Sequence, residues 1–179
     1  MTISHDRDLQ GLRKAGRIVA EVLGVLETAV EPGITTRELD SLCAAELAAR
    51  GAESAPAKVY DFPGSICISV NEEAVHGIPG TRTIVAGDLV KLDLVAIADG
   101  YFADAARSVV VPPAREETRR LARCARSAWK AAAGAARAGT TLQGLGRTIE
   151  GAVRRGGFRV IPELSGHGVG RSIHEEPAR

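Results

Sequence analysis

The dipeptide Asp99-Gly100, set between two runs of strand-forming residues, most constrains the fold of this chain. The runs are residues 84–98 and residues 101–111. Asp-Gly favours a type I′ turn, which needs positive φ at both central residues and joins two antiparallel strands. A two-residue turn also fixes the register. Three pairs of residues are predicted to lie opposite each other: Ala98 and Tyr101, Val95 and Asp104, and Asp93 and Ala106.

This register puts Asp93 and Asp104 on one face as diagonal neighbours, with α-carbons roughly 7 to 8 Å apart. One alternative is that both aspartates are solvated on the outer face of an amphipathic hairpin. The many apolar residues around them favour a hairpin that is covered on both sides. Two buried carboxylates would repel each other, and a bound cation would compensate them. Oxygen ligands favour Mg, Mn, Fe or Co, and an added imidazole favours a transition metal.

Helical periodicity describes the start of the chain. Apolar residues recur at three- and four-residue steps over residues 6–29, which predicts an amphipathic helix. Thr35 then stands three residues before Glu38, the spacing of a capping box, and opens a second helix that ends at Gly51.

A similar pattern returns after the hairpin. Residues 114–138 are rich in Ala, Arg and Glu and predict a long helix. Thr140 stands three residues before Gln143, which predicts a second capping box and a further helix. An apolar strand is predicted over residues 158–161.

The two helical patterns suggest a weak tandem repeat. Residues 32–36 correspond to residues 138–142, although capped helix pairs also recur by coincidence. The repeat predicts one domain over residues 1–179, with a first half of about 6–112 and a second of about 113–179. The second half is shorter than the first, so we expect the second half to be incomplete.

Composition excludes several classes of protein. A net charge of +1 with 45% apolar and 25% charged residues fits neither a disordered chain nor a basic nucleic-acid binder. Cys43, Cys67 and Cys124 are far apart, so neither a disulfide framework nor a thiolate zinc site is predicted. The polar N-terminus and the lack of a long apolar run predict a cytoplasmic protein that uses no membrane.

Three of the four histidines occur in segments framed by glycine or proline. They are His76, before Gly-Ile-Pro; His167, between two glycines; and His174, before Glu-Glu-Pro. Glycine beside a histidine allows close approach to a bound group, although a single histidine is more often an ordinary core or surface residue. The glycines around His167 lack the pattern of a nucleotide-binding loop.

Taken together, these segments resemble type I methionine aminopeptidases. The matching segments are residues 66–79 (ICISVNEEAVHGIP), 87–93 (GDLVKLD), 99–104 (DGYFAD), 166–170 (GHGVG) and 174–177 (HEEP). They occur in the family's order and spacing. The resemblance covers essentially the whole chain.

The resemblance implies an α+β pita-bread fold, with two pseudo-symmetric halves around two divalent metal ions, Co, Mn, Fe or Zn. It implies that Asp93, Asp104 and His167 bind metal. His76 and His174 are implied to be catalytic and to contact the substrate. The resemblance also implies a pocket for the methionine side chain that draws on Phe62 and Cys67, with Ile173 as a further candidate. The implied activity is removal of the N-terminal methionine from peptides and nascent chains by a monomer, with the ribosome as a candidate partner.

Two departures from the family pattern matter. The family's two metal-binding glutamates lie beyond the His-Glu-Glu-Pro segment, and Glu175 and Glu176 do not match them. Phe102 and Ala103 replace the His-Gly often found before the second aspartate. With three ligands of five, we expect weak metal binding and little turnover. An Xaa-Pro peptidase and a non-catalytic binding module with the same fold are the alternatives.

Overall fold

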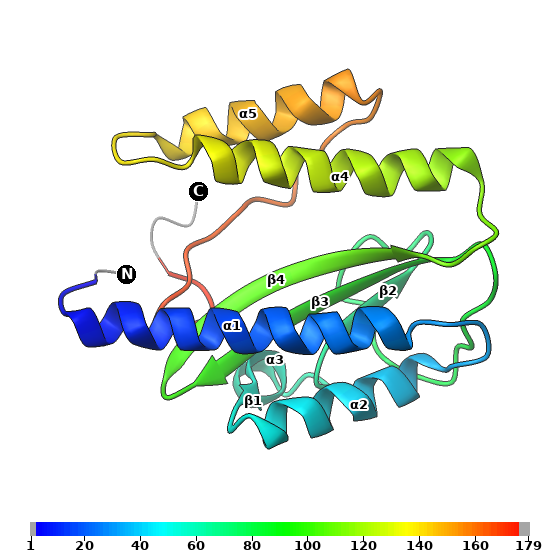
Figure 1. Ribbon diagram of the computed structural model, residues 1–179, viewed down its shortest axis with the longest axis horizontal. Helices are drawn as coiled ribbons and strands as arrows, with labels where there is room; N and C mark the ends of the chain where they lie inside the picture. The colour runs from blue at the N-terminus through cyan, green and yellow to red at the C-terminus, as the bar shows by residue number, and fades with distance from the viewer. Residues whose placement is uncertain (1–2, 176–179) are drawn as a thin grey trace. The chain divides into compact units, whose positions relative to one another are not determined.

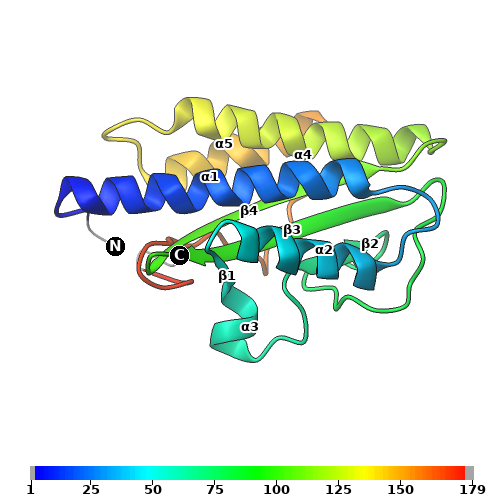
Figure 2. The same ribbon diagram turned by 60° about the horizontal axis from the view of Figure 1, so that its bottom comes forward.

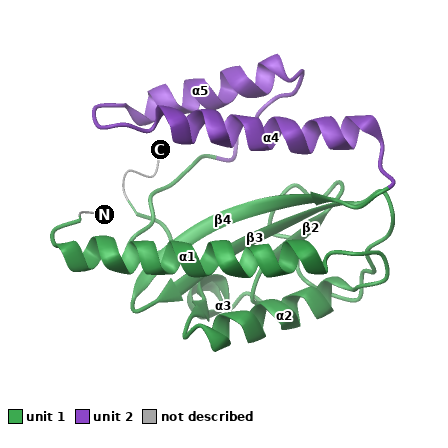
Figure 3. Cartoon of the chain, in the orientation of Figure 1, with its two compact units in different colours: residues 1–112, 165–179 green, residues 113–164 purple. Residues whose placement is uncertain are grey.

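The computed structural model describes residues 3–175 of the chain. Its contacts divide into two compact units, residues 1–112 with 165–179 and residues 113–164 (Figure 3). The first unit contains a sheet with helices, and the second is a pair of helices. No helix in the described part is both long and apolar enough to cross a membrane.

Both helices predicted at the start of the chain are confirmed. Helix α1 spans Asp6–Ala29 and buries its apolar stripe. Helix α2 spans Thr36–Ala49 and begins at the predicted capping box. The Thr35 hydroxyl accepts from the Glu38 N–H at 3.2 Å, and the Glu38 carboxylate accepts from the Thr35 N–H at 2.8 Å.

The sheet is antiparallel and is built around one long central strand. Its strands are β1 (Glu53–Ser54), β2 (Cys67–Val70), β3 (Leu89–Ala98) and β4 (Tyr101–Val110). Strand β3 pairs with β1 and β2 along one edge and with β4 along the other (Figure 1). A short helix, α3 (Ala55–Tyr60), follows β1 directly.

The predicted hairpin is confirmed, including its turn and its register. Asp99 and Gly100 both have positive φ, 52° and 76°. Three predicted pairs are found: Ala98 with Tyr101, Val95 with Asp104, and Asp93 with Ala106. The first strand is shorter than predicted and begins at Leu89. Residues 84–88 form a loop instead, in which Gly87 has a φ of 95°.

Different parts of the chain cover the two faces of the sheet. Alternate residues of β3 pack with apolar side chains of α1 and α2 in the main core: Val90, Leu92, Leu94 and Ala96. Helices α1 and α2 both lie on this face of the sheet (Figure 2). The opposite face carries Asp93 and Asp104 and is called the site face below. A smaller apolar cluster covers part of the site face: Ala55, Val95, Ile97, Phe102 and Ile173.

The prediction that the hairpin is covered on both sides is wrong for β4. Strand β3 is buried along almost its whole length, whereas residues 104–108 of β4 are exposed. Strand β3 has paired strands on both edges, but β4 pairs only with β3 in the described sheet. Apolar composition alone did not reveal this difference.

The second unit consists of α4 (Glu116–Ala135) and α5 (Leu142–Arg155). The predicted capping box at Thr140 and Gln143 is wrong by one residue. The hydroxyl of Thr141 caps α5 by accepting from the Gly144 N–H at 3.1 Å. The hydroxyl of Thr140 instead donates to the Ala135 carbonyl at 3.0 Å, which satisfies the end of α4.

The strand predicted over residues 158–161 is not formed. None of its four residues pairs with a strand in the described part of the chain. Because an isolated extended segment leaves its backbone groups without partners, apolar composition is not enough to make a strand there.

Candidate metal centre

Asp93 and Asp104 come together because of the hairpin register. Asp93 lies opposite Ala106, two residues beyond Asp104, so the two aspartates are diagonal neighbours on the site face. Their charges interact, because the negative charge of Asp104 raises the pKa of Asp93.

The Asp93 carboxylate lies in an unfavourable environment. Burial is the main cause that raises its pKa from 3.8 to about 6, and Asp104 adds to the shift. His76 and His167 act in the opposite direction. No residue of the described chain donates a hydrogen bond to this carboxylate. A carboxylate of this kind is stabilised either by a proton or by a cation.

Asp104 has a histidine partner. His167 Nε2 lies 3.4 Å from Asp104 Oδ2, and the two side chains are 24% and 27% exposed. Burial raises the pKa of Asp104, and His167 and His174 partly offset this. Asp104 therefore faces both histidines of the C-terminal segment.

These histidines lie on one short loop, residues 167–175, called the histidine loop below. The rings of His167 and His174 are 4.3 Å apart between centroids and inclined by 50°. Two backbone hydrogen bonds between Gly168 and Glu175, of 3.2 and 2.9 Å, close the loop. This closure brings together two side chains that are seven residues apart.

The histidine loop is fixed to the sheet. The Phe102 N–H at the start of β4 donates to the Gly170 carbonyl at 2.8 Å. Ile173 is 7% exposed and lies in the apolar cluster on the site face with Phe102. One main-chain bond and one apolar side chain thus place the loop beside β4.

Tyr60 contacts the candidate site, although no pattern in the sequence points to it. Its hydroxyl lies 2.8 Å from Nδ1 of His174, and the two rings are 6.1 Å apart. Tyr60 ends α3 and is 114 residues from His174 in the chain, so no local pattern connects them.

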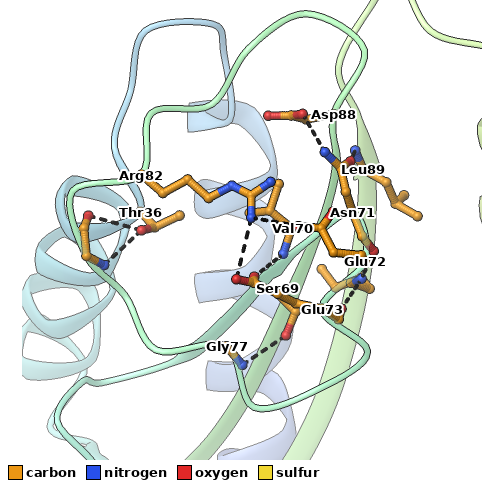
Figure 4. A network of polar contacts seen from close by, with 12 residues as sticks. Thr36, Ser69, Val70, Asn71, Glu72, Glu73, Gly77, Arg82, Asp88 and Leu89 are labelled. Carbon is orange, nitrogen blue, oxygen red and sulfur yellow. Dashed lines mark hydrogen bonds and ion pairs between the residues drawn. The ribbon is translucent and has the colours of Figure 1, made fainter.

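His76 reaches the site on a second loop, residues 71–77, whose backbone is tightly held at its end. His76 has a φ of 57°, which is unusual for a residue other than glycine. The Gly77 N–H donates to Ser69 Oγ at 3.0 Å (Figure 4). The Gly77 carbonyl accepts from the Ile68 N–H at 2.9 Å. A Cβ at Gly77 would come within 2.2 Å of the Ile68 carbonyl oxygen, so only glycine fits.

The start of the same loop is held by polar side chains. Asn71 has a φ of 55°, donates to Asp88 and accepts from the Leu89 N–H, both at 2.8 Å (Figure 4). The Lys91 ammonium donates to the carbonyl oxygens of Asn71 and Glu73. Both ends of the loop are therefore fixed, and the His76 side chain itself is exposed.

The three predicted pocket residues lie in different surroundings. Cys67 pairs with Asp93 across the strands, and burial, followed by the charges of Asp93 and Asp104, raises the pKa of its thiol to about 11. Cys67 is therefore a neutral thiol on the site face. Ile173 belongs to the apolar cluster there. Phe62 is half-buried just after α3, and its N–H donates to the Pro56 carbonyl.

The types of side chain present suit a divalent metal ion, although these side chains are not closely grouped. Two carboxylates and an imidazole are ligands for Mn, Fe, Co and Zn. A cation would also offset the burial and the repulsion by Asp104 that together raise the pKa of Asp93. Among residues 3–175, however, no three His, Cys, Asp or Glu side chains are grouped closely enough to hold an ion. Asp104 and His167 form the close pair, and Asp93 lies beside it.

Known sequences similar to this one are peptidases. The model of metallopeptidase family M24 matches residues 10–179. Methionine aminopeptidase 2 of Bacillus subtilis is 44% identical over 178 residues, which are 99% of this chain and 72% of the relative. A methionine aminopeptidase of Staphylococcus epidermidis is 41% identical over 99% of this chain and 71% of its own length.

Solved structures with this fold include both aminopeptidases and prolidases. The methionine aminopeptidase of Thermotoga maritima superposes with a TM-score of 0.96 at 30% identity, over 99% of this chain and 72% of that one. The prolidase of Pyrococcus furiosus superposes with a TM-score of 0.85 at 26% identity, over 98% of this chain and 51% of that one. The predicted pita-bread fold is confirmed by these likenesses.

Proposed function

Because this chain belongs to metallopeptidase family M24, we propose that it acts as a methionine aminopeptidase on the N-termini of peptides and nascent proteins. The observation that carries the proposal is that Asp93 and Asp104 are diagonal neighbours on one face of the sheet and that His167 lies 3.4 Å from Asp104. The similarity to aminopeptidases over 99% of the chain supports this choice of substrate.

We propose that Asp93, Asp104 and His167 hold divalent metal, with two ions at the complete site. Mn, Fe, Co and Zn all suit a set of carboxylates and imidazole. Bound metal would supply Lewis-acid polarisation of the peptide carbonyl and a water of lowered pKa. Asp93 also favours metal for an electrostatic reason, since its carboxylate has no donor among the described residues.

His174 is proposed to donate a hydrogen bond to the carbonyl oxygen of the scissile peptide. The Tyr60 hydroxyl supports this role if it donates to Nδ1 of His174, because the ring proton is then on Nε2. A neutral imidazole in this tautomer can stabilise negative charge as it develops on the carbonyl oxygen. His76, on its fixed loop, is proposed to contact the substrate near the scissile amide.

The side chain of the substrate methionine is proposed to contact Cys67 and Phe62, with Ile173 nearby. Cys67 remains a neutral thiol, so it offers a small apolar surface rather than a charge. We further propose a cytoplasmic monomer that meets nascent chains at the ribosome.

Metal affinity and turnover of this 179-residue chain are expected to be low. The open spacing of the donors agrees with weak binding, since a metal must draw Asp93 toward Asp104 and His167.

Substrate choice tests the proposal. The chain is incubated with Mn²⁺ and either Met-Ala or Ala-Pro peptides, and the release of free amino acid is followed with time. Slow, metal-dependent release of methionine, lost in Asp104→Asn, is the expected result. Preferential cleavage of Ala-Pro would instead indicate a prolidase-like enzyme.

Calorimetry with Mn²⁺ separates these enzymes from a non-catalytic module. We expect weak binding by the wild-type chain and none by Asp93→Asn. Equal heats for the two proteins, together with no cleavage of either peptide, would refute the proposed function.

A further inference from the structure

Arg171 connects three segments that are far apart in the sequence. Its Nη2 donates to Asp8 Oδ1 at 3.1 Å and to the Tyr101 hydroxyl at 2.5 Å. Its guanidinium carbon lies 3.7 Å from the centre of the Tyr101 ring, within the range of a cation–π interaction. Helix α1, strand β4 and the histidine loop therefore meet at one guanidinium.

The acceptors of this guanidinium are buried and already ordered. Asp8 is 7% exposed and Tyr101 is 6% exposed. The Tyr101 hydroxyl donates to Asp8 Oδ1 at 2.8 Å, while Asp8 Oδ2 accepts from the N–H groups of Ser4 and His5. Helix α1 lies directly against the Tyr101 ring, because a Cβ at Gly11 would come within 2.2 Å of it.

The charge of Asp8 is also secured. The Tyr101 hydroxyl is the largest cause that lowers the pKa of Asp8 to about 2, and backbone donors and Arg171 add to it. A fixed anion next to a fixed ring is a receptor for a guanidinium, which can bind the first and stack on the second.

The main chain of Arg171 is equally constrained within the histidine loop. Its N–H donates to Glu175 Oε1 at 2.5 Å, and the Ser172 N–H donates to the same oxygen at 3.1 Å. Arg171 lies four residues after His167 and three before His174. Because the loop is closed on itself, an anchor at Arg171 holds both histidines at once.

We propose that Arg171 is a positioning residue, which fixes the histidine loop on Asp8 and Tyr101 so that His167 and His174 face Asp104. The use of these histidines in catalysis depends on the function proposed above, whereas the anchoring does not. Arg171 itself contacts neither the aspartates of the site face nor the two imidazoles in the described structure.

Native-state hydrogen exchange of the metal-free chain tests the anchor. The backbone amides of Gly168 and Phe102 report on the loop. The Gly168 amide closes the loop on the Glu175 carbonyl, and the Phe102 amide binds β4 to the Gly170 carbonyl of the loop. In Arg171→Gln we expect their exchange to be about tenfold faster or more, the factor that follows from loss of one charge-assisted hydrogen bond. Exchange of amides paired between β2 and β3 should not change.

Three further variants make the test specific. Arg17→Gln removes the same charge from an exposed position on α1 and should leave all these rates as in the wild type. Tyr101→Phe keeps the ring but removes the hydroxyl, and Arg171→Lys keeps the charge but loses the planar fork. Each should give a smaller acceleration than Arg171→Gln.

Two results would overturn the proposal. One is unchanged exchange of Gly168 and Phe102 in Arg171→Gln. The other is an equal acceleration of the β2–β3 amides, which would mean general destabilisation rather than release of one loop. A separate Mn²⁺ titration keeps the two proposals distinct: a wild-type chain that binds no Mn²⁺ would refute the metal site and leave the exchange result standing.

Discussion

Asp93 should destabilise the metal-free chain at neutral pH, and Asp93→Asn should remove this cost. Its pKa of about 6 in the folded chain, against the usual 3.8, corresponds to about 3 kcal/mol. The folded chain binds the proton more tightly than the unfolded chain does. The contribution of Asp93 to stability is therefore most favourable below about pH 4 and falls as the pH rises from about 4 to about 6. Above that window the whole cost is present.

The assay compares urea unfolding of the wild-type chain and of Asp93→Asn in the presence of a chelator. Asparagine keeps the volume of the side chain and does not titrate. The stability of the variant relative to the wild type should increase by up to about 3 kcal/mol between about pH 4 and about pH 7. Only the change with pH is used, so a constant offset from the amide does not matter.

Asp61→Asn is the matched control, because Asp61 is exposed and asparagine tolerates its φ of 52° equally well. Its stability relative to the wild type should be the same at both ends of the pH range. A pH-independent difference for Asp93→Asn, or one of opposite sign, would refute the view that Asp93 is held as an uncompensated buried carboxylate.

Three other substitutions test the frame of the site. Gly77→Ala should destabilise the chain by on the order of 1–3 kcal/mol and displace His76, since the added Cβ meets the Ile68 carbonyl; thermal unfolding and the loop's amide shifts would show it. Leu92→Ala, in the fully buried core, should cost about 2–5 kcal/mol in chemical denaturation, and a loss under 1 kcal/mol would contradict the described packing. Thr35→Ala should cost about 1 kcal/mol and fray α2, which amide exchange at Glu38 would detect.

Local rules explain which parts of the fold could be predicted from the sequence. The turn at Asp99-Gly100 fixes its own register, so the convergence of Asp93 and Asp104 followed from counting residues. Helix α1 was predicted over its whole range, because periodicity and caps are properties of neighbouring residues. The cap of α5 was misplaced because Thr140 and Thr141 are adjacent and both suit an N-cap, and the Thr140 hydroxyl donates instead to the Ala135 carbonyl at the end of α4.

Long-range contacts explain what the sequence could not reveal. Tyr60 and His174 are 114 residues apart, and Asp8 and Arg171 are 163 apart. No spacing rule connects such pairs, and their residue types are common on protein surfaces. The exposure of β4 is a property of the whole sheet, because it depends on which strand lies at the edge.

The candidate site combines an aspartate with a raised pKa and two histidine-bearing loops that hydrogen bonds within the chain hold in place. The hairpin register makes Asp93 a diagonal neighbour of Asp104, and His76 and His167 only partly offset the burial and the repulsion that raise the pKa of Asp93. The loop that carries His76 is fixed by the hydrogen bond from the Gly77 N–H to Ser69 Oγ. The loop that carries His174 is fixed by the bond from the Phe102 N–H to the Gly170 carbonyl and by the bond from Arg171 to Asp8. Because hydrogen bonds within the described chain already hold these loops, a cation at the proposed site would act mainly on the charges of the two aspartates. A change at Asp93 should therefore alter the free energy of unfolding more than it alters the conformation of the histidine-bearing loops.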